Sequence, residues 1–535
     1  MTAIVISGGT YSGSGDVTTE YLYCLGSGAS GDIKPTCYLP DGTFTVTGEN
    51  STDYGGEGNT GFAINLPREA GLSNNPSVYA GTRGTIRVAT TTTTKIYVQY
   101  VHLGSVAYSG GASCQTIGDV YGNELHVEDG TFWSNGSGII TSGNAKAYDG
   151  GVLDLDSNNV NPSFGSLEIK TGGIVSGNNA GTITINYDKY NRTDLYSVMY
   201  RNNGTFVAND GTLKLKTNDD SLFGGDGGTG NPYNVQVENL GGGAATPYIR
   251  VYTTPTIDNN LTLSGSMEWS DNLGGGMVHT VGGTVTIISG AIYGRPGNSN
   301  VNKTFGALLV QAGGTYTAAT GAVTNITGPS SVSGYLWRSN YGTFNHNDGT
   351  VYFNTGSYNG ADIYPDSSEA FYNIILSGSG TVEMYGCTIG NNFTLGTDVI
   401  FRPITTTQAF IVSGATLING FFGKDGYPQT NVTHNTFGKL DIAAGGTYYA
   451  TSGETIIDMD MTGDGTDYGF QNNGTFTHNS GTVVASGAGT KCYINFTGSV
   501  VDPVFYNLTT KQTGDYCAIH TDLTVENMLD NQTYF

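Results

Sequence analysis

Short segments in which polar and apolar residues alternate recur along the whole chain, and glycine, asparagine or serine ends most of them. The segments Gly349-Thr350-Val351-Tyr352-Phe353-Asn354 and Gly283-Thr284-Val285-Thr286-Ile287-Ile288-Ser289-Gly290 show the pattern. A period of two predicts β-strands of about four to six residues, and punctuation by glycine and asparagine predicts tight turns between them. No stretch has the apolar spacing of a helix longer than two turns, so the pattern predicts an all-β protein.

One strand motif returns at a nearly constant interval. It contains Leu125, Leu261, Phe393 and Leu523, so successive copies are separated by roughly 130 residues, which is the mark of an internal repeat. Three further motifs keep their order inside each interval. They are Phe-Gly-x-Leu at 164–167, 305–308 and 437–440, Gly-Thr-Phe at 204–206, 342–344 and 474–476, and Tyr-Asn at 233–234, 372–373 and 506–507. The chain therefore contains three internal modules of about 133 residues.

The modules divide the chain into four regions. Residues 1–120 do not match the modules and are predicted to form an N-terminal β-rich region that serves as an anchor. The three modules are predicted to occupy 121–260, 261–392 and 393–535, the last including the C-terminal end.

Each module holds too many strands for one propeller blade, which needs about 40–50 residues. A coil that adds one rung per 20–25 residues or so, each rung pairing in parallel with the next, accommodates them. We therefore predict a right-handed parallel β-helix, or β-solenoid. Leu261, Phe393 and Leu523 are predicted to point inward at equivalent rungs. Glycine and asparagine are predicted to occupy the corners, where a positive φ is needed.

The pattern resembles that of the parallel β-helix proteins found in phage tail fibres and spikes and in bacterial adhesins. The residues that carry the resemblance are turns of the type Gly474–Val483 and the strand Phe505–Thr509. The resemblance covers about three quarters of the chain. It implies an architecture more than an activity.

The composition excludes several classes of function. The 535 residues carry a net charge of −23 with only 21 lysines and arginines, and no basic cluster is present, so a nucleic-acid groove is not expected. No apolar run reaches the roughly 18 residues of a membrane span. The first residues lack the basic region of a signal peptide, which favours synthesis in a cytoplasm.

The six cysteines form no Cys-x-x-Cys pair, so a zinc site is not expected. Cys24 with Cys37, and Cys492 with Cys517, could lie on neighbouring coils, whereas the alternative is that all are buried thiols.

His346 and His478 follow the Gly-Thr-Phe motif at equivalent positions, and this recurrence predicts a structural role in a turn.

Aromatic residues next to polar ones are the candidates for ligand binding, because sugar faces stack on exposed rings while polar groups satisfy hydroxyls. Before Gly-Thr-Phe, an aromatic residue is followed by arginine in two modules. The alternative is that these rings recur because they belong to the core. The candidate ligand-binding residues are Trp133, Tyr200, Arg201, Trp337 and Arg338.

Acidic loops are the only candidates for a metal site. Asp458, Asp460 and Asp464 are spaced as in a calcium loop, but Gly469 stands where a calcium-binding loop of the EF-hand type needs Glu. A second acidic patch contains Asp220 and Asp226. Solvated loops are the alternative for both. We expect no cofactor, with calcium as the one ion that these loops could hold.

The sequence predicts a structural protein and not an enzyme. Its predicted role is a virion appendage, namely a phage fibre, spike or capsid decoration that presents a rigid solenoid for host-surface attachment. One alternative is an exported adhesin or surface protein that forms fibres head to tail, and another is a polysaccharide depolymerase with paired carboxylates. The predicted partners are other virion or fibre subunits, further copies of the chain in a homo-oligomer, and host surface polysaccharide. The predicted location is the virion, or the cell surface in the adhesin alternative.

Overall fold

The computed structural model describes most of the chain after residue 100 and short strand segments before it. The described residues are 4–6, 10–12, 17–19, 22–24, 36–39, 43–46, 62–66, 77–80, 85–88, 94–98, 101–117, 120–134, 140–155, 161–177, 181–187, 198–225, 227–239, 247–251, 253, 256–269, 278–294, 301–318, 320–328, 334–339, 341–358, 360–366, 369–404, 409–423, 434–458, 468–487, 491–496, 504–512 and 516–532.

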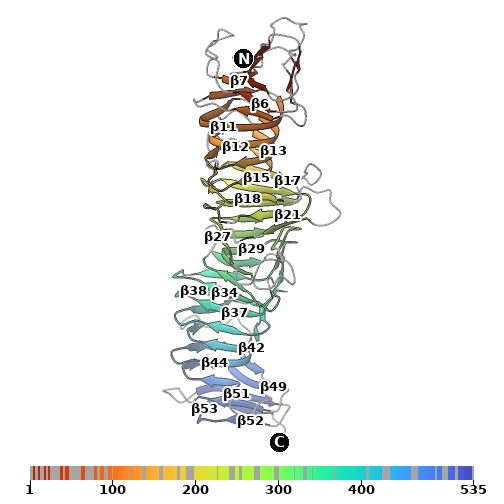
Figure 1. Ribbon diagram of the computed structural model, residues 1–535. Helices are drawn as coiled ribbons and strands as arrows, with labels where there is room; N and C mark the ends of the chain where they lie inside the picture. The colour runs from red at the N-terminus through yellow and green to blue at the C-terminus, as the bar shows by residue number, and fades with distance from the viewer. Residues whose placement is uncertain are drawn as a thin grey trace. The chain divides into compact units, whose positions relative to one another are not determined.

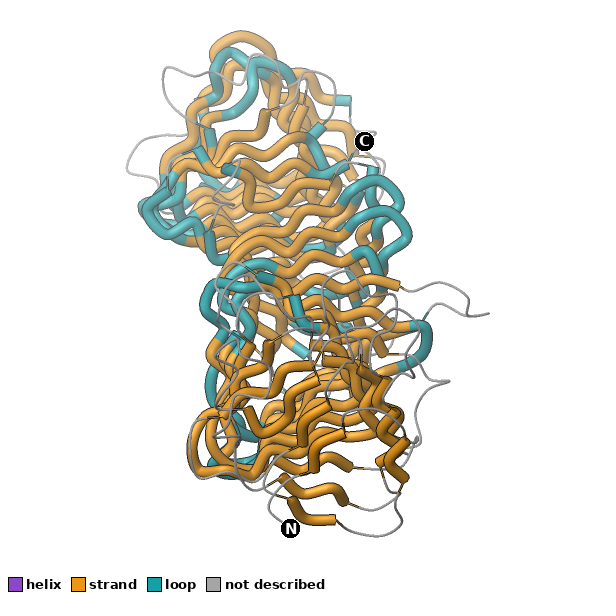
Figure 2. The backbone as a smooth tube through the Cα atoms, turned by 90° about the horizontal axis from the view of Figure 1, so that it is seen from above, coloured by secondary structure: helices purple, strands orange, loops and turns teal. Residues whose placement is uncertain are grey.

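These residues form β-strands and turns without a helix, as Figure 2 shows. Strands that are successive rungs pair in parallel, and the pairing repeats along the chain as in a β-solenoid (Figure 1). The all-β parallel solenoid predicted from the sequence is therefore confirmed. Its handedness and its division into three modules remain predictions.

The chain divides into two compact units. Unit 1 comprises Met1–Asn259 and Gly265–Ser270, and unit 2 comprises Asn260–Ser264 and Asp271–Phe535. The described segments of residues 1–120 are parallel strands, and several of them pair in a ladder. This ladder consists of β1 (Ile4–Ile6), β4 (Leu22–Cys24), β7 (Phe62–Leu66), β10 (Thr94–Val98), β11 (Val101–Ile117) and β12 (Val120–Ser134).

A second ladder of unit 1 carries Tyr200 and Arg201. It consists of β13 (Ile140–Ala147), β15 (Ser163–Ile169), β18 (Val198–Asn202), β21 (Ser221–Gly224), β23 (Tyr248–Val251) and β26 (Ser266–Trp269).

Unit 2 contains three long ladders. Ladder A consists of β31 (Val323–Ile326), β34 (Thr350–Asn354), β37 (Asn373–Ser377), β40 (Phe393–Leu395), β42 (Phe410–Ile418), β44 (His434–Ile442), β47 (Phe470–Asn472), β50 (Lys491–Asn495) and β52 (Tyr516–Ile519). Ladder B consists of β29 (Asn302–Val310), β32 (Tyr335–Ser339), β35 (Ala361–Tyr364), β38 (Thr381–Tyr385) and β41 (Ile400–Ile404). Ladder C runs from β44 through β46 (Glu454–Asp458), β49 (Thr482–Gly487) and β51 (Val504–Gln512) to β53 (Thr524–Asn531).

Alternation along each strand builds the core. In β34 the side chains alternate between half-buried and buried, and Val351 and Phe353 are the buried ones. Leu261 and Phe393 are fully buried, as predicted for the recurrent strand. Leu523 is only half-buried, so the prediction of equal burial is wrong there. It immediately precedes Thr524, the first residue of β53 that pairs with β51, and so it lies outside the ladder.

Asparagine forms the corners that the recurrent Gly-Thr-Phe strands lead into. Asn209, Asn347 and Asn479 have φ of 45°, 44° and 47°, and the residue after each also has a positive φ. Each asparagine amide donates to a backbone oxygen of an earlier rung, over 3.0, 2.8 and 2.6 Å respectively. Asparagine tolerates this left-handed conformation better than most residues, and its side chain fixes the turn to the neighbouring rung.

Glycine in the Phe-Gly-x-Leu motif is required by close contact between rungs. A Cβ at Gly165 would lie 2.3 Å from the Gly143 oxygen, and one at Gly438 would lie 2.1 Å from the Ser413 oxygen. The phenylalanine of the motif is buried at Phe164, Phe305 and Phe437. The motif therefore combines a core ring with a position where the backbones nearly touch.

Candidate functional site

The candidate site lies on the outer face of ladder B in unit 2, across four successive strands. We call it the outer stripe, and its residues are Tyr335, Arg338, Asp362, Tyr364, Glu383, Tyr385 and Arg402. Strand pairing aligns them in two columns. One column is Tyr335, Asp362, Glu383 and Arg402, and the other begins with Arg338 beside Tyr364.

A bulge in β32 places both Tyr335 and Arg338 on this face. The register shifts between Tyr335 and Trp337, so that Leu336 and Trp337 are both buried while their neighbours on either side are not. Without the bulge, strict alternation would turn Tyr335 and Trp337 to the same side of the strand.

Three tyrosine rings form a row in the stripe. The ring centroids of Tyr335 and Tyr364 are 6.1 Å apart, and those of Tyr364 and Tyr385 are 3.6 Å apart. The Arg338 guanidinium lies 4.7 Å from the centre of the Tyr335 ring. Tyr364 is 37% exposed, so the row is accessible to solvent at its middle ring. Partial burial raises the pKa of Tyr385 to about 12, and its phenol therefore stays neutral near neutral pH.

Charged groups of both signs flank the rings. Asp362 on β35 and Glu383 on β38 are register partners, and Glu383 forms an ion pair with Arg402 on the next strand. Burial, together with the charge of Glu383, raises the pKa of Asp362 above its usual value. The stripe thus places aromatic rings, of which Tyr364 is exposed, beside carboxylate acceptors and guanidinium donors. This combination suits a polyhydroxylated ligand such as a saccharide.

Unit 1 carries a counterpart of the charged pair with the signs exchanged. Arg250 on β23 contacts Glu268 on β26 over 3.0 Å, at positions that correspond to Glu383 and Arg402 in the following repeat of the sequence. Arg250 also pairs with Asp220 over 2.7 Å. Among the described residues of unit 1, Val198 and Gly224 stand at the positions that Tyr335 and Tyr364 occupy in unit 2, so neither of these two rings has a counterpart there. As far as the structure describes unit 1, the outer stripe therefore lacks a full counterpart there.

Two of the candidate ligand-binding rings, Tyr200 and Trp337, belong to the core, which agrees with the alternative that they recur as core residues. Tyr200 is 2% exposed and stacks on Phe223 at 5.2 Å. Trp337 is fully buried, and its ring packs against Phe344 at 4.8 Å. The residue before each arginine faces inward because strand alternation places the arginine itself outward.

The other three candidates lie on outer faces. Trp133 on β12 is half-buried, while the neighbouring Phe132 is fully buried, so the two point to opposite faces as expected. Arg201 forms an ion pair with Glu168 at 3.6 Å. Arg338 belongs to the outer stripe. Trp133 and Arg201 are residues of unit 1, and Arg338 is a residue of unit 2.

The predicted calcium loop is described only at its first residue. Asp458 is exposed at the end of β46 and accepts a hydrogen bond from Ser486 over 3.2 Å, whereas Asp460 and Asp464 lie outside the described residues. In the second acidic patch, Asp220 is held in the ion pair with Arg250, and Asp226 lies outside the described residues. The described part of the chain holds no group of three His, Cys, Asp or Glu side chains that could bind a metal ion.

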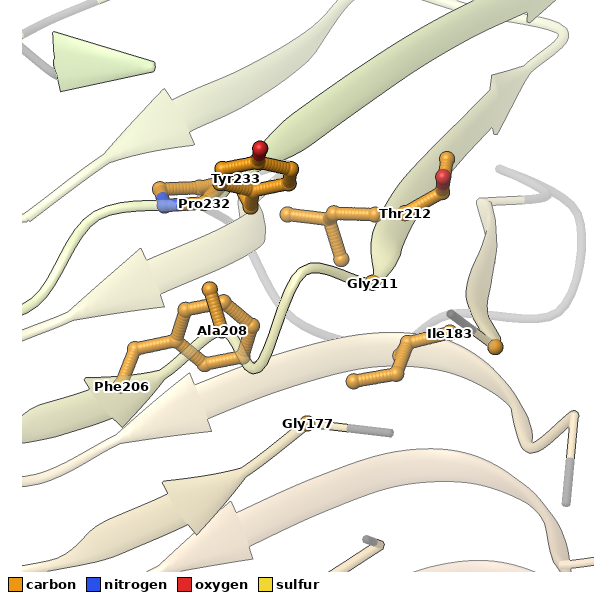
Figure 3. A pocket seen from close by; sticks show the side chains of 10 residues that line it. Gly177, Ile183, Phe206, Ala208, Gly211, Thr212, Pro232 and Tyr233 are labelled. Carbon is orange, nitrogen blue, oxygen red and sulfur yellow. The ribbon is translucent and has the colours of Figure 1, made fainter. Parts of the chain in front are cut away.

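A small hollow in unit 1 lies between successive rungs and is shown in Figure 3. Gly177, Ile183, Phe206, Ala208 and Tyr233 contribute to its lining. Its volume is about 10 Å³, so it has room for at most about one water molecule. The hollow is a packing defect at a corner and not a site for a ligand.

The recurrent histidines have the structural role that their spacing predicted. Nδ1 of His346 accepts a hydrogen bond from the backbone N–H of Asp348 over 3.0 Å, and Nδ1 of His478 accepts one from Ser480 over the same distance. The His346 ring also stacks on Tyr372 at 5.5 Å. Both imidazoles therefore close a turn.

Sequence reasoning found one residue of the outer stripe, Arg338, and missed the other six. The spacing of the tyrosines gives no periodic signal, since the interval from Tyr335 to Tyr364 is longer than the interval from Tyr364 to Tyr385. The sequence signal that could have revealed the tyrosine row is the presence of tyrosine at outward-facing positions of both β35 and β38. It becomes informative only once the register of the rungs is known.

Comparison of the chain with models of known protein families, with curated proteins and with solved structures found no significant match in any of the three. No described segment forms a helix long and apolar enough to cross a membrane.

Proposed function

We propose that the chain is the rigid shaft of a surface-attachment appendage that binds saccharide through the outer stripe without cleaving it. The appendage is a phage fibre, spike or capsid decoration, and its target is a host surface polysaccharide. The alternative is that the chain forms the shaft of an exported adhesin. The observation that carries the binding function is the tyrosine row flanked by Asp362, Glu383 and Arg402.

The chemistry of the stripe supports a saccharide ligand. The faces of pyranose rings are apolar and stack on aromatic side chains, while their hydroxyl groups need both donors and acceptors. The row runs across successive rungs, so it presents a repeated surface to a ligand that is itself a repeating chain. A rigid parallel ladder holds these side chains in place without a ligand, which reduces the entropic cost of binding.

The binding test is a glycan array of bacterial capsular polysaccharides and lipopolysaccharides, followed by titration of the best binder. We expect the double variant Tyr364→Ala/Tyr385→Ala to lose affinity by about tenfold or more, because stacking on each ring is lost. The matched control is Tyr358→Ala, which removes a tyrosine of unit 2 that is 51% exposed and lies off the stripe. Binding that survives the double variant, or is lost equally in the control, contradicts the assignment.

A depolymerase is the second candidate, and the pairing of Asp362 with Glu383 favours it. Glycoside hydrolysis uses two carboxyl groups, one of which keeps a proton because its pKa is raised. The raised pKa of Asp362 beside Glu383 fits the acid of such a pair. A reducing-sugar assay on the polysaccharide bound in the array distinguishes the two functions. Turnover that Asp362→Asn abolishes would replace the binding proposal with the enzymatic one.

The proposed location is the virion, with other fibre subunits and further copies of this chain as partners. The likeness of the turn pattern to phage fibres and spikes supports this location, and a solenoid that grows by adding rungs suits a shaft. Peptide mass spectrometry of purified virions tests it. Recovery of the chain from washed cell surfaces instead of virions supports the adhesin alternative.

A further inference from the structure

Two cysteines face each other across the last two strands of ladder A. Cys492 on β50 and Cys517 on β52 are register partners, and the residues on either side of them pair as well. Neighbouring parallel strands lie about 4.8 Å apart. A disulfide accepts Cα separations of about 4.4–6.8 Å, so in-register cysteines meet its requirement on Cα spacing.

The two thiols differ in their surroundings. Cys492 is fully buried, whereas Cys517 is half-buried on a strand whose Tyr516 and Ile519 are each 43% exposed. A hydrogen bond with the Cys492 thiol lowers the pKa of Cys517, against the effect of its burial. Cys517 is therefore the thiol that solvent-borne reagents reach, and it is the better nucleophile of the pair.

We propose that Cys492 and Cys517 form a disulfide that fastens β52 to β50 when the protein meets an oxidising environment. Both side chains are thiols in the structure. The disulfide would hold β52, the last strand of ladder A, against β50. Apolar side chains of β52 are only partly covered there. Ile519 is 43% exposed there, although its register partner Ile494 is 1% exposed.

The reaction is thiol–disulfide exchange with a small-molecule disulfide as the oxidant. The Cys517 thiolate attacks one sulfur of that disulfide, forms a mixed disulfide and displaces one thiol. The Cys492 thiolate then attacks the Cys517 sulfur and displaces the second thiol. The protein loses two S–H hydrogens and gains one S–S bond, and the two released thiols carry those protons and electrons.

Cys387, which lies away from this pair, provides a matched control. Cys387 is 6% exposed, and its thiol lies 3.9 Å from Met384 Sδ. Cys24 and Cys37 are aligned with Ile6 and Tyr11 and not with each other, so the alternative pair considered from the sequence lacks this register. Only the pair on β50 and β52 is in register among the described strands.

The test uses the full chain incubated with oxidised glutathione, then alkylated under denaturing conditions and digested without reduction. We expect one cross-linked peptide pair joining Cys492 to Cys517, lighter by about 2 Da than the two thiol peptides and lost after reduction. Cys387→Ser should retain this cross-link, and Cys517→Ser should lack it. In the oxidised protein, amide hydrogen exchange in β52 should slow by about tenfold or more relative to the reduced protein.

Two results would overturn the proposal. One is a stable glutathione adduct on Cys517 with Cys492 still open to alkylation, which shows that the second exchange step does not occur. The other is a cross-link that leaves exchange in β52 unchanged, because the bond then does not fasten the strand. Cys492→Ser provides a second test of the exchange mechanism. It replaces only one sulfur atom, so the chain should still fold, and the mixed disulfide should remain on Cys517.

Discussion

The Trp337 indole and the Glu369 carboxyl meet inside the core of unit 2, where Nε1 donates a hydrogen bond to Oε2 over 3.3 Å. The same oxygen accepts a hydrogen bond from the backbone N–H of Asp366 over 3.2 Å. Trp337 is fully buried and Glu369 is 6% exposed. Burial raises the pKa of Glu369 to about 7, so this carboxyl changes charge near neutral pH beside a fluorescent ring.

We predict that Trp337 fluorescence titrates with a midpoint near pH 7 and that Glu369→Gln abolishes the titration. The chain contains three tryptophans, so the measurement uses a Trp133→Phe/Trp269→Phe background. Because the folded state keeps a proton that the unfolded state releases, this carboxyl should also make the protein less stable as pH rises from about 4.5 to 7. Fluorescence that is flat across this range contradicts the assignment.

The second prediction concerns the repulsion between Asp362 and Glu383. Like charges on register partners destabilise a sheet, so Asp362→Asn should stabilise the protein by about 0.5 kcal/mol at neutral pH. Since the pKa of Asp362 is raised, the wild type loses stability as pH rises through that pKa, and the variant should not. Urea unfolding at pH 4 and pH 7 measures the difference. Asp398→Asn, an exposed turn residue, is the control and should have no effect.

Much of the fold could be predicted because it depends on local rules. Alternation identified the strands, and the recurrence of Leu261 and Phe393 identified core positions that the structure confirms. The asparagine corners followed from the need for a positive φ, which Asn347 and Asn479 adopt. Each of these features is determined by a few neighbouring residues, so one sequence is enough to find it.

The candidate site could not be predicted because it depends on register between rungs. The sequence leaves Trp337 either an exposed ring or a core ring, and the bulge in β32 turns it into the core beside Leu336. Tyr364 and Tyr385 meet because β35 and β38 pair with a particular alignment, and the intervening loop length hides that alignment in the sequence. A one-residue slip would place each tyrosine on the opposite face.

The third prediction tests the close approach of backbones at the Phe-Gly-x-Leu motif. Gly438→Ala should destabilise the protein by about 1–3 kcal/mol, because its Cβ would lie 2.1 Å from the Ser413 oxygen and the rung must shift. Gly328→Ala is the control, since nothing lies within 4 Å of its Cβ. We expect the control to remain within about 0.5 kcal/mol of the wild type. Equal urea midpoints for the two variants would show that contact between rungs does not require glycine.

A buried lysine in unit 2 gives the fourth prediction its physical basis. Lys303 on β29 is 1% exposed, and its Nζ donates a hydrogen bond to the Thr317 oxygen over 2.9 Å. The ammonium also lies 4.9 Å from the centre of the Tyr316 ring and 5.5 Å from that of Tyr293. These contacts do not compensate fully for the loss of water, because burial lowers the pKa of Lys303 from 10.5 to about 7.

We predict that the stability of the protein rises between pH 7 and pH 9 and that Lys303→Met removes most of this rise. In that range the unfolded state keeps the lysine proton while the folded state has lost it, so raising the pH favours folding by about 2 kcal/mol. Methionine has a similar length and no charge, which leaves the surrounding packing nearly intact. The measurement is amide hydrogen exchange of β29 in the full chain, with each exchange rate compared with the intrinsic rate at the same pH. A rise of the same size in the variant would show that Lys303 keeps its proton in the core, with its ammonium stabilised by the Thr317 oxygen and the two tyrosine rings.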